Sequence, residues 1–305
     1  MLIRLSALNA LLCAAWCCAG AASAAACPPA DWDKARLLTL RANQFAVSDP
    51  AERVRLGDAL LACLKDPDPV LRDQVAYEAY ATWLRSGVFA DEHVARWTVQ
   101  LLDDLADTTP DPAGVRRPFA ALVLSELART DRIKPHFEPA LRQRLVADAT
   151  AYLRQCRDYR GFSESIGWRH GVAHAADWVM QLGLNDRVKA PALRGFQDAL
   201  LGQVGAHGQY AYIDGESERL ARAVLMLMHR NELTADSWVT ALAQFDHPET
   251  VPNWSDVFGS RTGLNERHNL RQFLYELDEG VRASQLPAKQ AYVDVIARLL
   301  KATAV

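Results

Sequence analysis

The helical spacing of apolar residues is the feature of this sequence that most constrains its fold. After residue 27, apolar side chains recur at helical period in nearly every segment, and no segment alternates apolar and polar residues between hairpin turns. Short breaks rich in Pro, Gly and Asp separate the segments. The predicted helices span residues 31–45, 49–66, 66–84, 91–107, 116–130, 136–156, 167–182, 191–204, 216–230, 235–245, 265–282 and 287–301. About a dozen helices joined by short loops predict an all-α fold.

One predicted helix, "DPDPVLRDQVAYEAYATWL", indicates how these helices pack. Asp68 can cap the helix, Pro69 fits its first turn, and Val70 and Val75 face a neighbouring helix, as in the second helix of HEAT-type repeats. We therefore predict one domain, residues 27–305, whose helix pairs stack into a HEAT/armadillo-like α-α superhelix. The sequence contains no second clear copy of this pattern, and the alternative is an irregular helical bundle.

Residues 1–26 have the layout of a secretory signal peptide. Arg4 precedes an apolar run from Leu5 to Gly20, and small residues follow up to Ala26. Cleavage is predicted near Ala24 or Ala26, which would place the protein in the periplasm or outside the cell, with no stable membrane span. The alternatives are an uncleaved signal that anchors the chain in a membrane, and a lipid anchor on Cys27.

Three cysteines, Cys27, Cys63 and Cys156, would remain after cleavage. An oxidising compartment would allow one disulfide and leave one thiol, but the sequence does not choose the pair. In the alternative interpretation, Cys63 and Cys156 are small buried side chains on apolar helix faces. The formal net charge of -3 gives no indication of nucleic acid or an anionic membrane as a partner.

The segment "GWRHGVAHAADW" combines buried-type residues with a polar set. On a helix, His170, His174 and Asp177 fall within a sector of roughly 60°, and Gln181 joins them. The apolar residues around Val179 lie on or near the opposite side. The segment therefore predicts a helix with an apolar face and a separate His/His/Asp edge.

This edge has three interpretations. Histidines four positions apart have the spacing of helical zinc sites, so His170, His174 and Asp177 are candidate ligands of a divalent metal. The further ligand would come from a set that comprises Glu164, His207, Asp214, Glu216 and His268. Gly171 stands where the metalloprotease motif has glutamate. The other interpretations are a ligand-binding edge, and histidines that hydrogen-bond to neighbouring helices.

Charged residues on both sides of this helix extend the candidate site. The predicted binding residues are Arg160, Trp168, His170, His174, Asp177, Asp214, Glu216 and Arg219. The candidate catalytic residues are His170, His174, Asp177 and Glu164, since paired carboxylates can act as acid and base. Helix capping and the helix dipole provide a structural explanation for the carboxylates from Asp214 to Glu218.

Several of these segments resemble a bacterial family. "DPDPVLRDQVAYEAYATWLRSG", "RRPFAALVLSELARTD", "DYRGF…GWRHGVAHAADW" and "DGESERLARAV" are similar in content and order to domain-of-unknown-function family 2785, over about Asp49 to Glu276. The most specific part is Gly-Trp-x-His-x-x-x-His-x-x-Asp, carried by residues 167–177. The resemblance implies an all-helical, HEAT/armadillo-like fold and brings no activity. Arg169 departs from the small residue expected between the tryptophan and the first histidine.

Two functional hypotheses follow from these observations. In the first, an exported α-solenoid holds a peptide, glycan or protein on a surface that includes His170, His174 and Asp177. In the second, the same edge belongs to a hydrolase that uses carboxylates and histidines, with or without a metal. A third interpretation is architectural, with the polar residues locking the central helices together.

Overall fold

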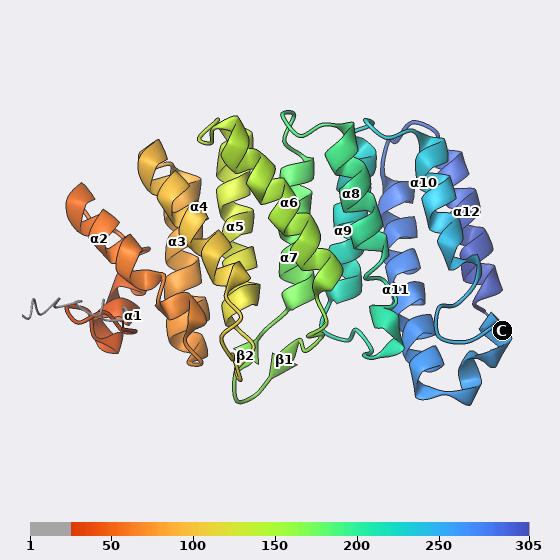
Figure 1. Cartoon of the computed structure of the whole chain (residues 1–305), viewed down its shortest axis with the longest axis horizontal. Coiled ribbons are helices and arrows are strands. Elements are labelled where there is room, and N and C mark those ends of the chain that lie inside the picture. Colours follow the sequence, from red (N-terminus) through yellow and green to blue (C-terminus); the bar gives the residue numbers. More distant parts are fainter. Residues whose placement is uncertain (1–25, 305) are drawn as a thin grey trace, which may run out of the picture.

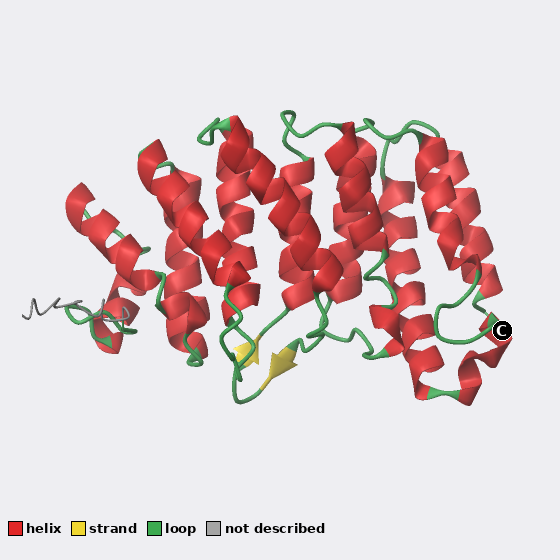
Figure 2. Cartoon of the chain, viewed as in Figure 1, coloured by secondary structure: helices red, strands yellow, loops and turns green. Residues whose placement is uncertain are grey.

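The computed structural model describes residues 26–304, and this part of the chain is all-α, as predicted. The twelve α-helices of this described part stand side by side in a row that runs from α1 at one end to α12 at the other (Figure 1). Figure 2 shows that the only strands in the described part form one small hairpin. No helix within residues 26–304 is both long and apolar enough to cross a membrane. The predicted signal peptide, except Ala26, lies outside the described residues.

The helices from α3 onward alternate between two layers. The first layer comprises α3 (Glu78–Ser86), α5 (Arg116–Ile133), α7 (Gly171–Gly183), α9 (Glu216–His229) and α11 (Arg261–Ala283). The second comprises α4 (Asp91–Ala106), α6 (Pro139–Gln155), α8 (Ala190–Leu201), α10 (Ala235–Leu242) and α12 (Lys289–Ala302). Neighbours within each layer contact one another, and pairs such as α6 and α7 contact across the layers. One continuous core of buried apolar side chains extends from Leu37 to Leu299.

The N-terminal part is held by a disulfide. It contains α1 (Lys34–Ala42), α2 (Pro50–Leu60), the short 3₁₀ helix η1 (Cys63–Lys65) and the π-helix η2 (Val70–Tyr77), which continues directly into α3. The disulfide joins Cys27 to Cys63, whereas Cys156 is a buried free thiol. The structure thus selects one of the pairings that the sequence left open.

Side-chain caps explain several helix boundaries. Asp49 accepts a hydrogen bond from the Ala51 N–H, and Pro50 occupies the first position of α2, as predicted. The predicted start of the helix at 265 is wrong, because the Ser260 hydroxyl accepts from the Gly263 N–H and begins α11 at Arg261. The remaining 3₁₀ helices are η3 (Ala206–Gly208), η4 (Ala243–Asp246) and η5 (Trp254–Gly259).

The predicted helix over 167–182 begins late. Its first residues instead form strand β2 (Gly167–Trp168), which pairs antiparallel with β1 (Phe162–Ser163). Gly167 has a φ of 73°, and a Cβ there would lie 2.9 Å from Pro69 Cβ, so a side chain would meet both strain and a clash. His170 also has a left-handed φ of 56°, and α7 begins only at Gly171. A helical wheel cannot detect the turn at residues 167–170, because Gly167 packs there against Pro69, which immediately precedes η2 and is distant in the chain.

Two buried arginines fix the hairpin against distant segments. Arg72 of η2 donates to the Ile166 carbonyl at 2.7 Å and to the Trp168 carbonyl at 3.3 Å. Arg169 donates to the Ala113 carbonyl at 2.6 Å and so ties β2 to the loop before α5. Figure 1 shows the hairpin at the lower end of the row of helices. The Arg72 and Arg169 side chains hold it there.

Candidate functional site

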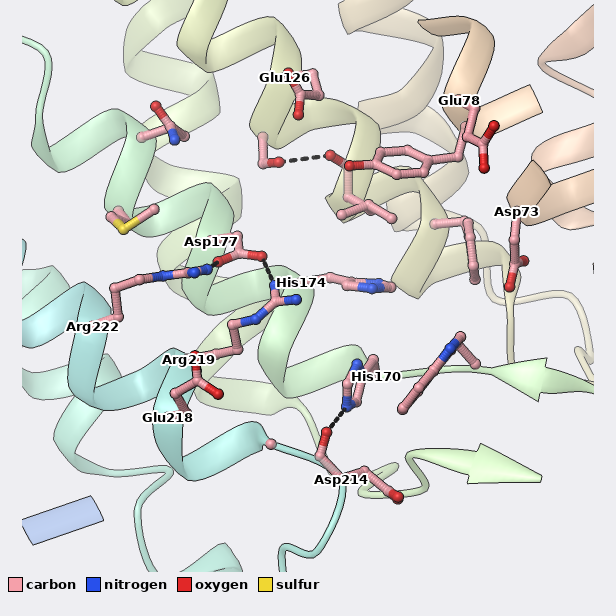
Figure 3. Close-up of a pocket in the computed structure, with 18 of the residues that line it drawn as sticks. Asp73, Glu78, Glu126, His170, His174, Asp177, Asp214, Glu218, Arg219 and Arg222 are labelled. Atoms are coloured by element: carbon pink, nitrogen blue, oxygen red, sulfur yellow. Dashed lines mark hydrogen bonds and ion pairs between the residues drawn. The ribbon is translucent and has the colours of Figure 1, made fainter. Parts of the chain in front are cut away.

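A pocket of about 840 Å³ opens on the first layer of helices. Four consecutive elements of this layer line it, namely the η2–α3 segment, α5, α7 and α9, together with the hairpin. Figure 3 shows their side chains converging on one space. Asp73, Tyr77, Glu78 and Arg85 come from η2–α3, Phe119, Leu122, Ser125 and Glu126 from α5, and Asp214, Glu218, Arg219, Arg222 and Met226 from α9 and the residues before it. Trp168, His170, His174, Asp177, Met180, Gln181 and Leu184 complete the lining with α7 and its flanks.

Eight of the 21 lining residues come from η2–α3 and α5, and none of them was among the predicted site residues. A signal was present, because Asp73, Tyr77 and Arg85 recur at intervals of four and eight residues on a segment whose other residues are mostly apolar. The π-helix carries the first two of these side chains, and π-helical turns are often found at functional sites. Sequence spacing alone does not show that this stripe and the α7 stripe face the same space.

Asp177 anchors two arginines at the edge of the pocket. Its Oδ1 accepts from Arg222 Nη2 at 2.6 Å, and its Oδ2 is ion-paired with Arg219. The Asp177 side chain is only 12% exposed, whereas both arginines are partly exposed. One carboxylate thus orients two guanidinium groups, each of which keeps further N–H donors. Figure 3 shows this trio on one side of the pocket, with His174 beside it.

The charged side chains that the η2–α3 segment contributes to the pocket also form ion pairs. Glu126 accepts two hydrogen bonds from Arg85, and Glu78 accepts two from Arg41 of α1. Asp73 Oδ1 lies 2.7 Å from Nε of the neighbouring Arg72. Burial raises the pKa of Asp73 to about 6, because the attraction of Arg72 only partly offsets the loss of water. Asp73 at the pocket wall therefore has a pKa of about 6.

His170 is held from three sides. Its Nε2 donates to the Asp214 carbonyl at 2.8 Å, since only the imidazole can supply the proton to a carbonyl oxygen. A carboxylate oxygen of the buried Glu216 lies 3.5 Å from the same nitrogen, and the indole of Trp168 stacks on the ring at 4.5 Å between centroids. Burial lowers the pKa of His170, and the hydrogen bond to Asp214 partly opposes this shift. The ring is therefore neutral at pH 7.

His174, one turn further along α7, also donates one ring N–H to a backbone carbonyl. Its Nδ1 donates to the Pro118 carbonyl at 3.1 Å, and the edge of its ring meets Phe119 at 5.4 Å between centroids. Burial, followed by the nearby His170, lowers the pKa of His174 well below its ordinary value. Within residues 26–304, His170 Nδ1 and His174 Nε2 have no hydrogen-bond partner. Two unprotonated imidazole nitrogens thus belong to residues that line the pocket.

The structure brings together most of the predicted site residues. Trp168, His170, His174, Asp177, Asp214 and Arg219 all line the pocket. Glu216 lies behind it, buried against His170. Arg160 and Glu164 do not reach the pocket: Arg160 is exposed and paired with Asp158, and Glu164 lies at the exposed turn of the hairpin.

Several of the predicted metal ligands either bind other side chains or lie outside the pocket. Both oxygens of Asp177 bind arginines, and His207 and His268 lie outside the pocket, where His207 contacts Glu249 and His268 donates to the Tyr212 carbonyl. Among residues 26–304, no group of three or more His, Cys, Asp and Glu side chains is placed to hold a metal ion.

Comparison with known proteins identifies one family. A family model described as "Protein of unknown function (DUF2785)" matches residues 106–278, which is more than half of the chain. The matched region includes the pocket residues of α5, the hairpin, α7 and α9, and leaves out those of η2 and α3. No curated protein and no solved structure matches the chain.

Proposed function

The chain belongs to the DUF2785 family, and from that premise we propose that it is an exported, HEAT-like helical binding protein whose pocket holds an extended peptide. The observation that carries the proposal is the pocket of about 840 Å³ built from stripes of four consecutive elements. Stacked helix pairs form extended surfaces of this kind, and pockets of this size accommodate several residues of a bound chain.

The chemistry of the lining favours a peptide over a glycan. Arg219 and Arg222 keep free N–H donors for backbone carbonyls, and the two imidazole nitrogens can accept backbone N–H groups. Met180 and Met226 lie beside these polar groups, and methionine adapts to apolar side chains of different shape. A peptide supplies both backbone groups and apolar side chains, whereas a sugar offers few apolar groups for the methionines.

Export is supported by the disulfide. A bond between Cys27 and Cys63 is typical of proteins that fold in an oxidising compartment. It also occupies the sulfur that a lipid anchor on Cys27 would require. Both points favour a cleaved signal peptide and a soluble mature chain in the periplasm or outside the cell.

When the full-length chain is expressed in a bacterium with its own N-terminus, we expect a mature protein in the periplasmic fraction. Its intact mass should match cleavage after Ala24 or Ala26, with one disulfide and no acyl chains. Mass spectrometry of the fractionated protein, with and without reduction, measures this. An uncut chain, an acylated Cys27 or a reduced protein confined to the cytoplasm would contradict the export proposal.

The binding proposal predicts that the pocket selects peptides from a random phage-displayed library. Gln181→Trp fills the pocket from a half-buried position on α7 and should weaken an enriched peptide at least about tenfold, which is about 1.4 kcal/mol. The matched control is Gln290→Trp, on the exposed side of α12. Calorimetric titration measures the affinities. Failure of the wild type to enrich any peptide, or equal binding by both variants, would refute peptide binding in this pocket.

A second candidate function, peptide hydrolysis, is favoured by one contact. Glu216 lies 3.5 Å from His170 Nε2, while His170 Nδ1 is unprotonated, so Nδ1 can act as a general base toward a water molecule. In that case the wild type and the Gln290→Trp variant would cleave the enriched peptide, and His170→Asn would bind it without cleavage.

A further inference from the structure

We propose that the hairpin end of the pocket recognises a cationic group of the ligand, an ammonium or a guanidinium. This inference rests on the proposed binding function and adds the charge of the ligand to it. Four observations carry it: the carboxylates without an ion-pair partner, the unpartnered imidazole nitrogens, the partly exposed side chain of Trp168, and the way the hairpin positions Asp214.

The carboxylates that line the pocket outnumber the arginines that line it. Six carboxylates and three arginines line it. All three arginines are already ion-paired, Arg85 with Glu126 and both others with Asp177. Asp214 and Glu218 form no ion pair with any residue from 26 to 304. Arg219 and Arg222 share the one carboxylate of Asp177 and therefore offset only part of the negative charge of Asp214 and Glu218, and a ligand cation would neutralise the remainder.

The unpartnered histidine nitrogens require a ligand that donates hydrogen bonds. His170 and His174 are both more than nine-tenths buried, and each directs its proton to a backbone carbonyl. Their remaining nitrogens are acceptors at the pocket. An ammonium carries three N–H donors and a guanidinium five, whereas a carboxylate or phosphate has none to offer. Figure 3 shows His170 between His174 and Asp214.

Trp168 offers a surface for the same charge. Its side chain is 40% exposed, although the indole packs against His170 and makes a T-shaped contact with Phe162 at 5.1 Å between centroids. An exposed tryptophan beside carboxylates is the arrangement in which cation–π attraction adds to ion pairing. The contacts with His170 and Phe162 hold the ring in place before a ligand arrives.

The hairpin positions the carboxylate of Asp214. Oδ2 accepts from the Phe162 N–H at 3.1 Å, and a Cβ on Gly161 would lie 2.0 Å from this oxygen, so only glycine permits the approach. Oδ1 has no hydrogen-bond partner within residues 26–304. The backbone thus fixes one carboxylate oxygen and leaves the other for a ligand.

The test is a calorimetric titration with capped peptides of the form Ala-X-Ala. In the cationic peptides X is Lys or Arg, and in their neutral analogues X is acetyl-lysine or citrulline. A peptide with X = Glu and free spermidine complete the series. The cationic peptides should bind at least about tenfold more tightly than their neutral analogues. Asp214→Asn/Glu218→Gln keeps the shape of both side chains and should remove this preference. Asp186→Asn/Glu92→Gln changes the net charge equally at exposed sites outside the pocket and should retain it.

A second variant guards against a folding defect. Trp168→Leu alters a partly exposed side chain and should weaken the cationic peptides several-fold more than the neutral ones. Equal binding of cationic and neutral peptides, tightest binding of the Glu peptide, or a preference that survives in Asp214→Asn/Glu218→Gln would overturn the cation site and leave peptide binding intact. Binding of spermidine but of none of the peptides would support the cation site and refute the proposal that the pocket binds peptides. Binding of none of these compounds would overturn both.

Discussion

Replacement of Asp131 by alanine is expected to lower the free energy of unfolding by about 4 kcal/mol. Asp131 is 1% exposed at the end of α5 and accepts five hydrogen bonds at 2.7–2.9 Å, two of them from Arg142. The other donors are the backbone N–H groups of His136 and Phe137 and the side chain of Asn185. Its loss would leave the buried Arg142 guanidinium with only the Phe137 carbonyl as an acceptor and three other donors without their partner, and would remove the polar links from α5 to Arg142 of α6 and to Asn185 after α7.

Chemical denaturation at pH 7 measures this change. Asp186→Ala is the matched control, since Asp186 is 94% exposed, and it should alter stability by less than about 0.5 kcal/mol. Burial would raise the pKa of Asp131, but hydrogen bonds from Arg142 and the backbone outweigh it and hold this pKa below 3.8. The stabilisation is therefore present at neutral pH and is lost as the pH falls through the folded-state value. An Asp131→Ala protein as stable as the wild type would show that the network contributes no net stability.

Replacement of Arg72 by methionine should be nearly as costly, at about 3 kcal/mol. Arg72 is 0% exposed, and it donates to the Asp66 carbonyl before η2 and to the carbonyl of Ile166 in the hairpin, which is 94 residues away. Methionine fills similar space and removes every donor. Asp73 would then lose its partner, and its pKa should rise above about 6, since burial would act alone.

This substitution should also loosen the site. Hydrogen exchange at the amides of 161–170 should accelerate, because Arg72 supplies the contacts that hold β2 against η2. Arg55→Met, at an exposed position on α2, is the control and should change neither exchange nor stability measurably. Unchanged protection of the hairpin in Arg72→Met would mean that Arg169 and the Asp214 contact suffice to anchor it.

Part of the pocket lining was predicted from the sequence, and part was not. His170, His174 and Asp177 were predicted to share one edge, and all three line the pocket, because four- and three-residue spacings describe both a helix and its N-terminal turn. The proposed role of Asp177 as a ligand of a divalent metal stays a prediction. In the structure, both of its carboxylate oxygens contact arginines. Those arginines lie on α9, and no local pattern in α7 indicates which charges it meets there.

The sequence by itself determined most of the helices and the Asp49 cap of α2, because periodic burial and side-chain capping depend on residues a few positions apart. It thereby determined the all-α class, and its motifs identified the family. Only the tertiary structure decided that a hairpin precedes α7, where Gly167 packs against Pro69 and Arg72 reaches the hairpin carbonyls. It likewise decided that η2–α3 completes the pocket and that Cys27 pairs with Cys63. These features depend on contacts between residues far apart in the chain, and packing of the two layers sets those contacts.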